Sequence, residues 1–464
     1  MIHFNMKDSK ISRLVLGWFF VCNLCLSAVG QHQPSPETEE VSPTNALAHY
    51  IHMEDDAYQW ELKESAVSGK STIYQLLLTS QVWRDHLWRH QLTVIVPREI
   101  DHDGAMLFIS GGSNKDEQPN WNTQDRMWPA LANVAEKNRA IISILKQTPN
   151  QPLYGGKTED KLISYTFHNF QNDKDYTWPL LFPMVKSALK AMDAIQEFAA
   201  QQLNHQVNRF IVSGASKRGW TTWLAAATGD PRIKAIAPMV IDVLNMPVNL
   251  QYQVDSYGAY SEQIQDYVNL GIVQSIATEE GKALTTMIDP YSYRPLLTAP
   301  KMIFIGTNDE YWTVDAVKHY YYDLPGKKMI HYVPNVGHDL GGGKQALAAL
   351  SAFFGTTLTG ENYPTLSWET EKAEGTTLFT FSLEDPNIVK AEMWAASSVD
   401  RDFRDEKWKS SNLGKADSKK IMLEESHPQA GYKAFYIDVT YRAPYGGTYT
   451  VSSRIFLLGE EGLL

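Results

Sequence analysis

A serine lies between two glycines in the stretch FIVSGASKRGW, residues 210–220, where its hydroxyl could serve as a nucleophile. The apolar run at 209–214 predicts a strand, and the pattern at 220–227 predicts a helix. Ser216 therefore falls on the turn between them. A serine on a sharp strand-to-helix turn holds its hydroxyl clear of the sheet, as hydrolases that form acyl-enzymes require.

The residues around Ser216 only partly match the usual nucleophile turn. Gly214 and Ala215 are small enough to allow strained backbone angles. The usual turn has glycine two residues after the serine, whereas this chain has Arg218 there and Gly219 one position later. Taken alone, a motif of this kind is structural more often than catalytic, because such short matches arise by chance.

An acid and a histidine follow the serine in the order that suits a catalytic triad. Asp309 comes three residues after the apolar run at 301–306, and His338 follows the run at 328–334. The intervening residues leave room for one helix, 314–322, and one strand. A serine needs a base to take its proton, and the base needs an acid to fix its tautomer. The sequence therefore predicts Ser216, Asp309 and His338 as catalytic residues.

Other side chains compete for these two roles. Glu310 or Asp315 could be the acid, and Asp309 could instead cap a helix. His319 and His331 compete with His338, but one falls in the predicted helix and the other within a strand. Asp339 is interpreted as a helix cap rather than a second catalytic acid.

Acyl transfer also requires hydrogen-bond donors aimed at the developing oxyanion. The backbone N–H of Lys217, directly after the serine, is one candidate. The second is Gly112 in the GGSN segment at 111–114, which follows an early strand and is free to approach a ligand closely. A plain turn is the alternative interpretation of that segment.

Three side chains near the predicted nucleophile are candidates for binding the substrate. Lys217 and Arg218 could hold an acidic group, although they could equally be solvated or paired with Asp242 or Glu310. Trp312 could line an aromatic cleft, although tryptophan in a large core is common.

The elements that must position these residues alternate between strands and helices. Apolar runs predict strands at 91–97, 105–112, 140–146, 209–214, 233–241, 301–306 and 328–334. Several are apolar on consecutive residues, as strands covered on both faces must be. A period of three to four residues over 184–199 predicts a helix packed on the sheet. The sequence therefore predicts an α/β fold with a mostly parallel sheet and helices on both sides.

Two stretches depart from this alternation. Residues 247–297 are rich in Tyr and Gln and predict a cap over the site. After about residue 360 a period of two takes over at 379–383, 435–441 and 449–455, which predicts a small antiparallel β-sandwich. We therefore expect an α/β-hydrolase domain at 46–360 and a β-sandwich domain at 361–464.

The first 45 residues differ in composition from the rest. Three basic residues precede the apolar stretch LVLGWFFVCNLCLSAVG, which ends in small residues and predicts a signal peptide over 1–30, cleaved near Gly30. Residues 31–45 are polar, with three prolines, and predict a disordered lead-in. Both cysteines, Cys22 and Cys25, lie in the leader. We expect a secreted or periplasmic protein without disulfides and without a stable membrane anchor.

The composition and motifs of the chain limit the partners and cofactors that we expect it to bind. The 464 residues are 43% hydrophobic and carry a formal charge of -11, or about -13 without the leader. Such an acidic chain is a poor ligand for nucleic acid. No phosphate-binding or dinucleotide-binding motif is present, and His86 and His90 lack a clear third metal ligand, so we expect neither a cofactor nor a metal.

The segments LFISGGSN, FIVSGASKRGWTTWLAAATGDPRIKAIAPMVIDVLNM, FIGTNDEYW and NVGHDL together resemble the PhoPQ-activated pathogenicity-related family, which also includes autocrine proliferation repressor-like secreted proteins. The GASKRGWTTW element is the specific part. The resemblance implies an α/β-hydrolase fold, a secreted or envelope location and a triad at Ser216, Asp309 and His338. Glucuronoyl esterases have a similar turn with the later glycine, so Gly219 does not exclude catalysis.

The sequence thus favours a secreted serine hydrolase that forms an acyl-enzyme on a small-molecule, peptide or glycan ester substrate. Residue types do not distinguish an ester from an amide. The alternative is a binding or signalling protein that keeps the hydrolase scaffold without turnover.

Overall fold

A computed structural model describes residues 40–464, apart from 126, 386 and 415–418. The chain divides into two compact units, Met1–Glu40 and Val41–Leu464, and the second carries all the elements below. The predicted signal peptide lies outside the described residues. Of the predicted lead-in, residues 42–45 form a turn in which Ser42 N–H donates to Asn45 Oδ1 over 2.8 Å. Helix α1, Ala46–His52, begins directly after it.

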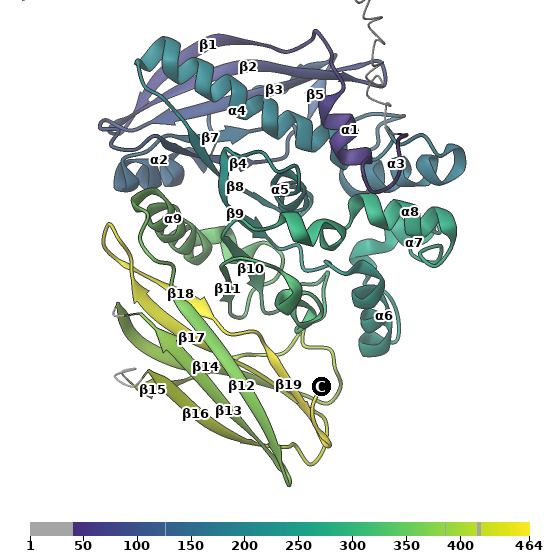
Figure 1. Ribbon diagram of the computed structural model, residues 1–464, viewed down its shortest axis with the longest axis vertical. Coiled ribbons are helices and arrows are strands. Elements are labelled where there is room, and N and C mark those ends of the chain that lie inside the picture. The colour runs from purple at the N-terminus through teal and green to yellow at the C-terminus, as the bar shows by residue number, and fades with distance from the viewer. Residues whose placement is uncertain (1–39, 126, 386, 415–418) are drawn as a thin grey trace, which may run out of the picture. The chain divides into compact units, whose positions relative to one another are not determined.

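A mostly parallel sheet forms the centre of the larger unit (Figure 1). Its strands lie in the order β2-β3-β7-β4-β8-β9-β10-β11, with β1 on the outer edge beside β2. Pairing is antiparallel as far as β7 and parallel from β7 to β11. The bounds are Gln59–Ser68 (β1), Ser71–Trp83 (β2), His86–Val96 (β3), Gly104–Ile109 (β4), Ile142–Leu145 (β7), Arg209–Ala215 (β8), Ile233–Met239 (β9), Lys301–Gly306 (β10) and Lys328–Val333 (β11).

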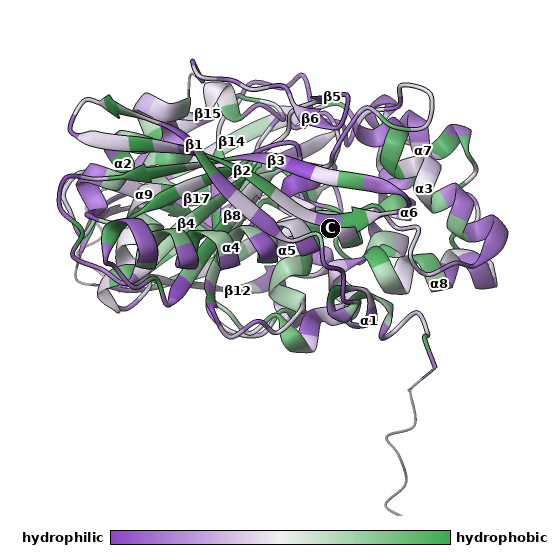
Figure 2. Cartoon of the chain, turned by 90° about the horizontal axis from the view of Figure 1, so that it is seen from above, coloured by the Kyte–Doolittle hydropathy of each residue, from purple (hydrophilic) through white to green (hydrophobic). Residues whose placement is uncertain are grey.

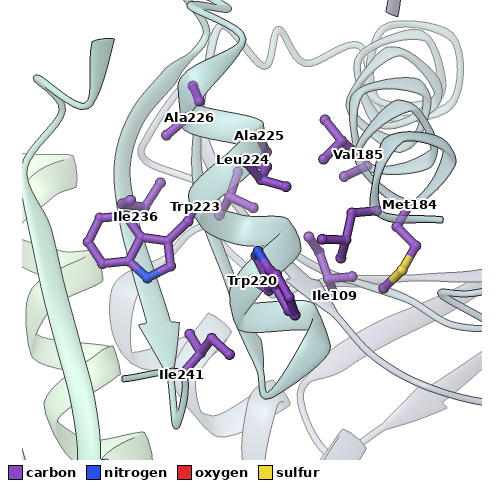
Figure 3. Packing of buried hydrophobic residues seen from close by; sticks show 14 of the residues in the cluster. Ile109, Met184, Val185, Trp220, Trp223, Leu224, Ala225, Ala226, Ile236 and Ile241 are labelled. Atoms are coloured by element: carbon purple, nitrogen blue, oxygen red, sulfur yellow. The ribbon is translucent and has the colours of Figure 1, made fainter. Parts of the chain in front are cut away.

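Helices cover both faces of this sheet, as the buried parallel strands require. Helices α4 (Leu181–Leu203) and α5 (Lys217–Ala227) pack on one face, and α2 (Met127–Asn138) and α9 (Lys344–Thr359) pack on the other. Figure 3 shows the first face, where Trp220, Trp223 and Leu224 of α5 lie among side chains of α4 and the strands. The strand order, the helices on both faces and the turn between β8 and α5 define an α/β-hydrolase fold.

The segment between β9 and β10 folds into short helices that lie together beside the sheet (Figure 1). They are α6 (Met246–Tyr257), η1 (Glu262–Ile264), α7 (Gln265–Asn269), α8 (Glu279–Ile288) and η2 (Pro290–Leu296). In Figure 2, hydrophilic residues mark the outer side of α8, while hydrophobic residues gather on the central strands. These helices form the cap insertion.

Antiparallel strands follow α9 and extend the central sheet. Strand β18 pairs with β11, and the order continues through β17 and β14 to β15, with β19 and β20 beside β17. A second sheet, β12-β13-β16, faces them. The bounds are Thr365–Ala373 (β12), Thr376–Glu384 (β13), Ile388–Ser398 (β14), Lys409–Gly414 (β15), Lys420–Ser426 (β16), Tyr432–Arg442 (β17), Thr448–Ser452 (β18), Phe456–Gly459 (β19) and Gly462–Leu463 (β20).

Aromatic side chains hold the two sheets of this sandwich together. The ring of Phe379 on β13 lies edge-on to Phe435 of β17 at 4.8 Å and to Phe456 of β19 at 4.9 Å between centroids. These phenylalanines belong to the same apolar cluster as Phe353 and Phe354 of α9. The sandwich therefore shares a hydrophobic core with the α9 face of the α/β sheet.

Candidate active site

The backbone of Ser216 has the strained conformation of a nucleophile elbow. Its φ of 59° and ψ of -125° lie outside the regions that side-chain-bearing residues favour, between the end of β8 and the start of α5. Its N–H donates to Met239 O at the end of β9 over 2.9 Å. This turn holds the serine at the carboxyl edge of the sheet.

Two glycines make this turn possible by removing a Cβ from a crowded position. A Cβ on Gly214 would lie 2.7 Å from Arg218 O, and a Cβ on Gly219 would lie 2.7 Å from Met239 O. The glycine that is displaced by one position in the sequence is thus the one that lets α5 approach β9. Arg218 occupies the position where glycine is usual, and its side chain binds Glu159.

Asp309 and His338 meet at the same edge of the sheet. His338 Nδ1 lies 2.9 Å from Oδ2 and 3.0 Å from Oδ1 of Asp309. The Asp309 side chain is 3% exposed, and burial raises the pKa of its carboxyl although the bonded His338 opposes the shift. Tyr311 N–H also donates to Asp309, over 3.0 Å. The carboxylate accepts a hydrogen bond from Nδ1–H, so in the neutral imidazole Nε2 is the nitrogen that carries no proton.

The other ring nitrogen is available for chemistry. His338 Nε2 is buried and has no hydrogen-bond partner within the described part of the chain. Tyr311 stacks on the imidazole with ring centroids 4.1 Å apart, and it also lines the cavity in which Ser216 lies. Since Nε2 has no partner, no hydrogen bond joins it to Ser216 Oγ within the described residues. A free imidazole nitrogen is what a general base requires.

The competing acids and histidines have other partners. Glu310 accepts the backbone N–H of His338 over 3.0 Å, so it holds the histidine loop rather than the ring. Asp315 pairs with Lys318, and His331 is buried with Nδ1 near Thr450 O. His319 lies in a 3-10 turn, Ala316–His319 (η3), and packs against Tyr252.

The prediction of one helix over 314–322 is wrong. The chain there forms two short 3-10 turns, η3 and Tyr321–Asp323 (η4). Large aromatic side chains, Tyr320 and Tyr321, are buried in this segment, and packing them overrides the helical period. Asp339 does act as a cap, since its side chain accepts Gly341 N–H at the start of a turn before α9.

The two charged residues after Ser216 are paired inside the protein. Arg218 donates to both carboxylate oxygens of Glu159 over 2.7 Å each and, through Nε, to Thr148 O over 2.6 Å. The pairing considered with Asp242 or Glu310 is therefore wrong. Since all three guanidinium nitrogens are occupied and the residue is buried, the expectation that Arg218 binds substrate is also corrected.

Glu159 joins Arg218 to the loop that was predicted to supply an oxyanion donor. Burial would raise the pKa of Glu159, but the hydrogen bonds and charge of Arg218 outweigh it and hold the pKa at about 2. Gln151 bridges Glu159 Oε1, over 2.6 Å, to the carbonyl of Gly112, over 3.0 Å. The backbone around Gly112, at φ 150°, is thus tied to the nucleophile elbow.

Lys217 and Trp312 line a cavity that also includes Ser216. Lys217 Nζ lies 2.7 Å from Asp160, which also accepts the Tyr267 hydroxyl over 2.9 Å. Pattern reasoning missed Glu159, Asp160 and Tyr311. The one available signal was that two consecutive cations at a buried turn require acidic partners, and the sequence TED at 158–160 supplies them.

The loops that carry Asp309 and His338 are also attached to the C-terminal sandwich. The side-chain amide of Asn308 donates to the carbonyls of Phe403, Arg404 and Glu406. Asn335 exchanges two hydrogen bonds with the backbone of Trp408, at 2.8 and 3.0 Å. Residues 403–408, here called the sandwich loop, therefore hold the loops that carry Asp309 and His338 in place.

No helix in the described part of the chain is both long and apolar enough to cross a membrane. His90, one of the paired histidines considered for a metal, is buried in β3 and bonded to Ser80 and to Lys146 O. Burial lowers its pKa to about 4. His86 packs edge-on against Tyr154.

Comparison with solved structures finds esterases at low identity. Acetyl xylan esterase 1 from Thermoanaerobacterium sp. JW/SL YS485 is 16% identical with a TM-score of 0.48, covering 68% of this chain and 92% of that one. A glucuronoyl esterase from Solibacter usitatus is 12% identical with a TM-score of 0.43, covering 68% and 91%. The activities in these names are properties of those proteins alone.

Comparison of sequences, unlike that of structures, identifies the family of this chain. Autocrine proliferation repressor protein A of Dictyostelium discoideum is 30% identical over 428 residues, 85% of each chain. The model of the PhoPQ-activated pathogenicity-related protein family matches residues 47–404, which span the elbow, the cap and the loops that carry Asp309 and His338. The chain belongs to the PhoPQ-activated pathogenicity-related protein family.

Proposed function

We propose that this protein is a serine hydrolase that cleaves an ester or peptide bond through an acyl-enzyme on Ser216. The observation that carries the proposal is the hydrogen bond between His338 Nδ1 and the buried Asp309 carboxylate, which leaves Nε2 without a partner in the described chain, together with the strained elbow at Ser216. A fold alone does not give a function, so the proposal rests on this pair, whose arrangement matches the base and orienting acid of a catalytic triad.

In the proposed reaction, Ser216 Oγ attacks the substrate carbonyl carbon while His338 Nε2 takes the hydroxyl proton. The new C–O bond forms a tetrahedral oxyanion, which the N–H groups of Lys217 and Gly112 stabilise. The bond to the leaving alcohol or amine then breaks, and His338 donates its proton to that group. Water repeats the sequence, with His338 as base, to release the acid and restore Ser216.

Asp309 keeps the imidazole in the required tautomer and stabilises it when it becomes charged. The Arg218–Glu159–Gln151 network holds the elbow and the Gly112 loop at a fixed separation. We further propose that the protein acts outside the cytoplasm, after removal of residues 1–30, because the leader has the charge and hydropathy pattern of a signal peptide.

A second candidate function is signalling without turnover, which the name of the Dictyostelium relative favours. The two are separated by assaying aryl esters, methyl glucuronates and dipeptide amides with wild type, Ser216→Ala and the control Ser256→Ala on α6. The proposal predicts hydrolysis of at least one class by wild type and Ser256→Ala, reduced at least 1,000-fold in Ser216→Ala. A folded wild type inactive on all classes supports the signalling alternative.

A further inference from the structure

A partly open, largely apolar cavity begins at the proposed nucleophile. It holds about 80 Å³ and is lined by Ser216 and Lys217 on the elbow side. The cap supplies most of the remaining wall, including Leu250 of α6, Ile272 in the turn between α7 and α8, and Leu284 of α8. An apolar group could therefore pass from the reacting atom directly into the cap.

Most of the polar groups around the cavity are already satisfied by the protein. Lys217 and the Tyr267 hydroxyl both bind Asp160, and Trp220 Nε1 donates to Ile288 O over 2.6 Å. The indole nitrogen of Trp312 is the exception, being buried without a partner in the described chain. A hydroxyl-rich or charged group would lose its hydration here and regain few hydrogen bonds, so the lining favours a hydrocarbon.

The position of His338 indicates whether the cavity binds the acyl group or the leaving group of the substrate. The leaving group takes a proton from His338 Nε2, so it must lie on the histidine side of the scissile bond. The cavity is lined by Ser216 but not by His338 or Asp309. Tyr311, which stacks on His338, does line it, so the cavity includes the serine but not the imidazole itself. On this ground the acyl group, rather than the leaving group, is placed in the cavity.

The volume sets the length of that group. An apolar protein cavity of about 150 Å³ accepts benzene, which has six carbons, so 80 Å³ accommodates about three. Resting on the proposed function, we infer that the cavity binds a short, uncharged acyl chain with about three carbons beyond the carbonyl, as in a butyryl ester. During turnover this chain stays bound to Ser216 Oγ as the acyl-enzyme while the alcohol departs.

The test is the dependence of kcat/KM on chain length for p-nitrophenyl acetate, propionate, butyrate, hexanoate and octanoate, which share one leaving group. Each methylene buried in the cavity should raise kcat/KM about fourfold, so butyrate should exceed acetate by about 15-fold. The value should fall beyond butyrate because the cavity is then full. A flat profile, or a maximum at hexanoate or octanoate, overturns the inference.

Two variants on the same helix make the test specific. Leu284→Ala enlarges the cavity and should move the optimum to hexanoate or longer. Met287→Ala, which is equally buried on α8 but does not line the cavity, should leave the optimum at butyrate. A shift of the optimum in both variants, or in neither, contradicts the assignment.

A binding measurement separates this inference from the proposed function. Thermal unfolding of Ser216→Ala with about 10 mM methyl butyrate should show a raised Tm, and the variant Leu250→Trp, which fills the cavity, should abolish the shift. No shift in Ser216→Ala overturns the inference even if wild type hydrolyses esters. A shift without hydrolysis of esters or dipeptide amides by wild type supports the cavity assignment and rejects the proposed function.

Discussion

His338 Nδ1 lies 2.9 Å from Asp309 Oδ2, although the two residues are 29 positions apart and follow different strands. They meet because β10 and β11 are parallel neighbours in register, with Gly306 opposite Val333, so the loops after them leave the same edge of the sheet. Gly306 also permits this approach, since a Cβ there would lie 2.4 Å from Gly337 O.

Replacing Asp309 by asparagine should reduce kcat by 10³- to 10⁴-fold with little change in stability. The amide cannot hold the imidazole in the tautomer that leaves Nε2 free, which is the loss measured for the corresponding change in serine proteases. The control is Asp315→Asn, since Asp315 is an equally buried acid nearby that pairs with Lys318. Similar losses of kcat in both variants would contradict the assignment of Asp309.

Replacing Glu159 by glutamine should destabilise the protein, because it leaves the Arg218 guanidinium buried without its counter-charge. Breaking a fully buried pair costs about 3–5 kcal/mol. The Glu159 side chain is 37% exposed, so screening reduces the expected loss to about 2 kcal/mol at pH 7. Urea unfolding measures it, with Glu279→Gln in an exposed pair as the control.

The Glu159–Arg218 pair should also make the stability of the protein depend on pH. The pKa of Glu159 is depressed to about 2 in the folded protein, so its stabilisation is complete above the ordinary carboxyl pKa and is lost as the pH falls through 2. The stability difference between wild type and Glu159→Gln should therefore be constant from pH 7 to about pH 5 and shrink below it. A difference that grows on acidification would contradict the assigned pairing.

Replacing Asn308 by alanine removes three hydrogen bonds to the sandwich loop and should lower kcat about tenfold, with KM nearly unchanged. The substitution leaves the cavity intact but frees the loop that carries Asp309, so positioning is affected and binding is not. Steady-state kinetics with one ester substrate measures kcat and KM separately. Asn412→Ala, on exposed β15, is the control, and a raised KM with unchanged kcat would count against the positioning role.

Replacing Asp242 by asparagine should flatten the pH dependence of stability. Burial raises the pKa of Asp242 to about 7, with the nearby Asp309 adding to the shift and the Tyr320 hydroxyl opposing it. A raised folded pKa means that stability is highest below about pH 4 and declines as the pH rises toward 7.

The variant should consequently be more stable than wild type at pH 8, by an amount on the order of 2–4 kcal/mol, and equal to it near pH 4. Chemical unfolding at both pH values measures this. An equal difference at pH 4 and pH 8 would show that Asp242 does not titrate differently on folding.

Much of the fold was predictable because buried strands have a strong local signature. The seven predicted strands correspond to β3, β4, β7, β8, β9, β10 and β11, within a few residues at their ends. The face that Phe379, Phe381 and Leu383 form was also predicted from a period of two, and all three are buried. Strand β1 was missed because it is largely exposed. Strand β2 is mostly buried but was also missed, because polar residues such as Gln75, Ser80 and Gln81 interrupt its apolar run.

The site residues were predictable only where they directly follow a predicted strand in the sequence. Asp309 and His338 were identified because each directly follows a buried strand. The partners of Arg218 were not, because Glu159 and Gln151 lie in a loop with no periodic pattern. The cap cavity was also beyond prediction, as it depends on how Ile272 and Leu284 pack against the elbow.

The most direct test of the central claim is mass spectrometry of the protein after reaction with a fluorophosphonate probe. The account predicts one adduct on the peptide that contains Ser216, formed by wild type and by Asp315→Asn, slowed at least 100-fold in His338→Ala and absent from Ser216→Ala. A folded wild type that gains no adduct, or an adduct located on another residue, would contradict the account.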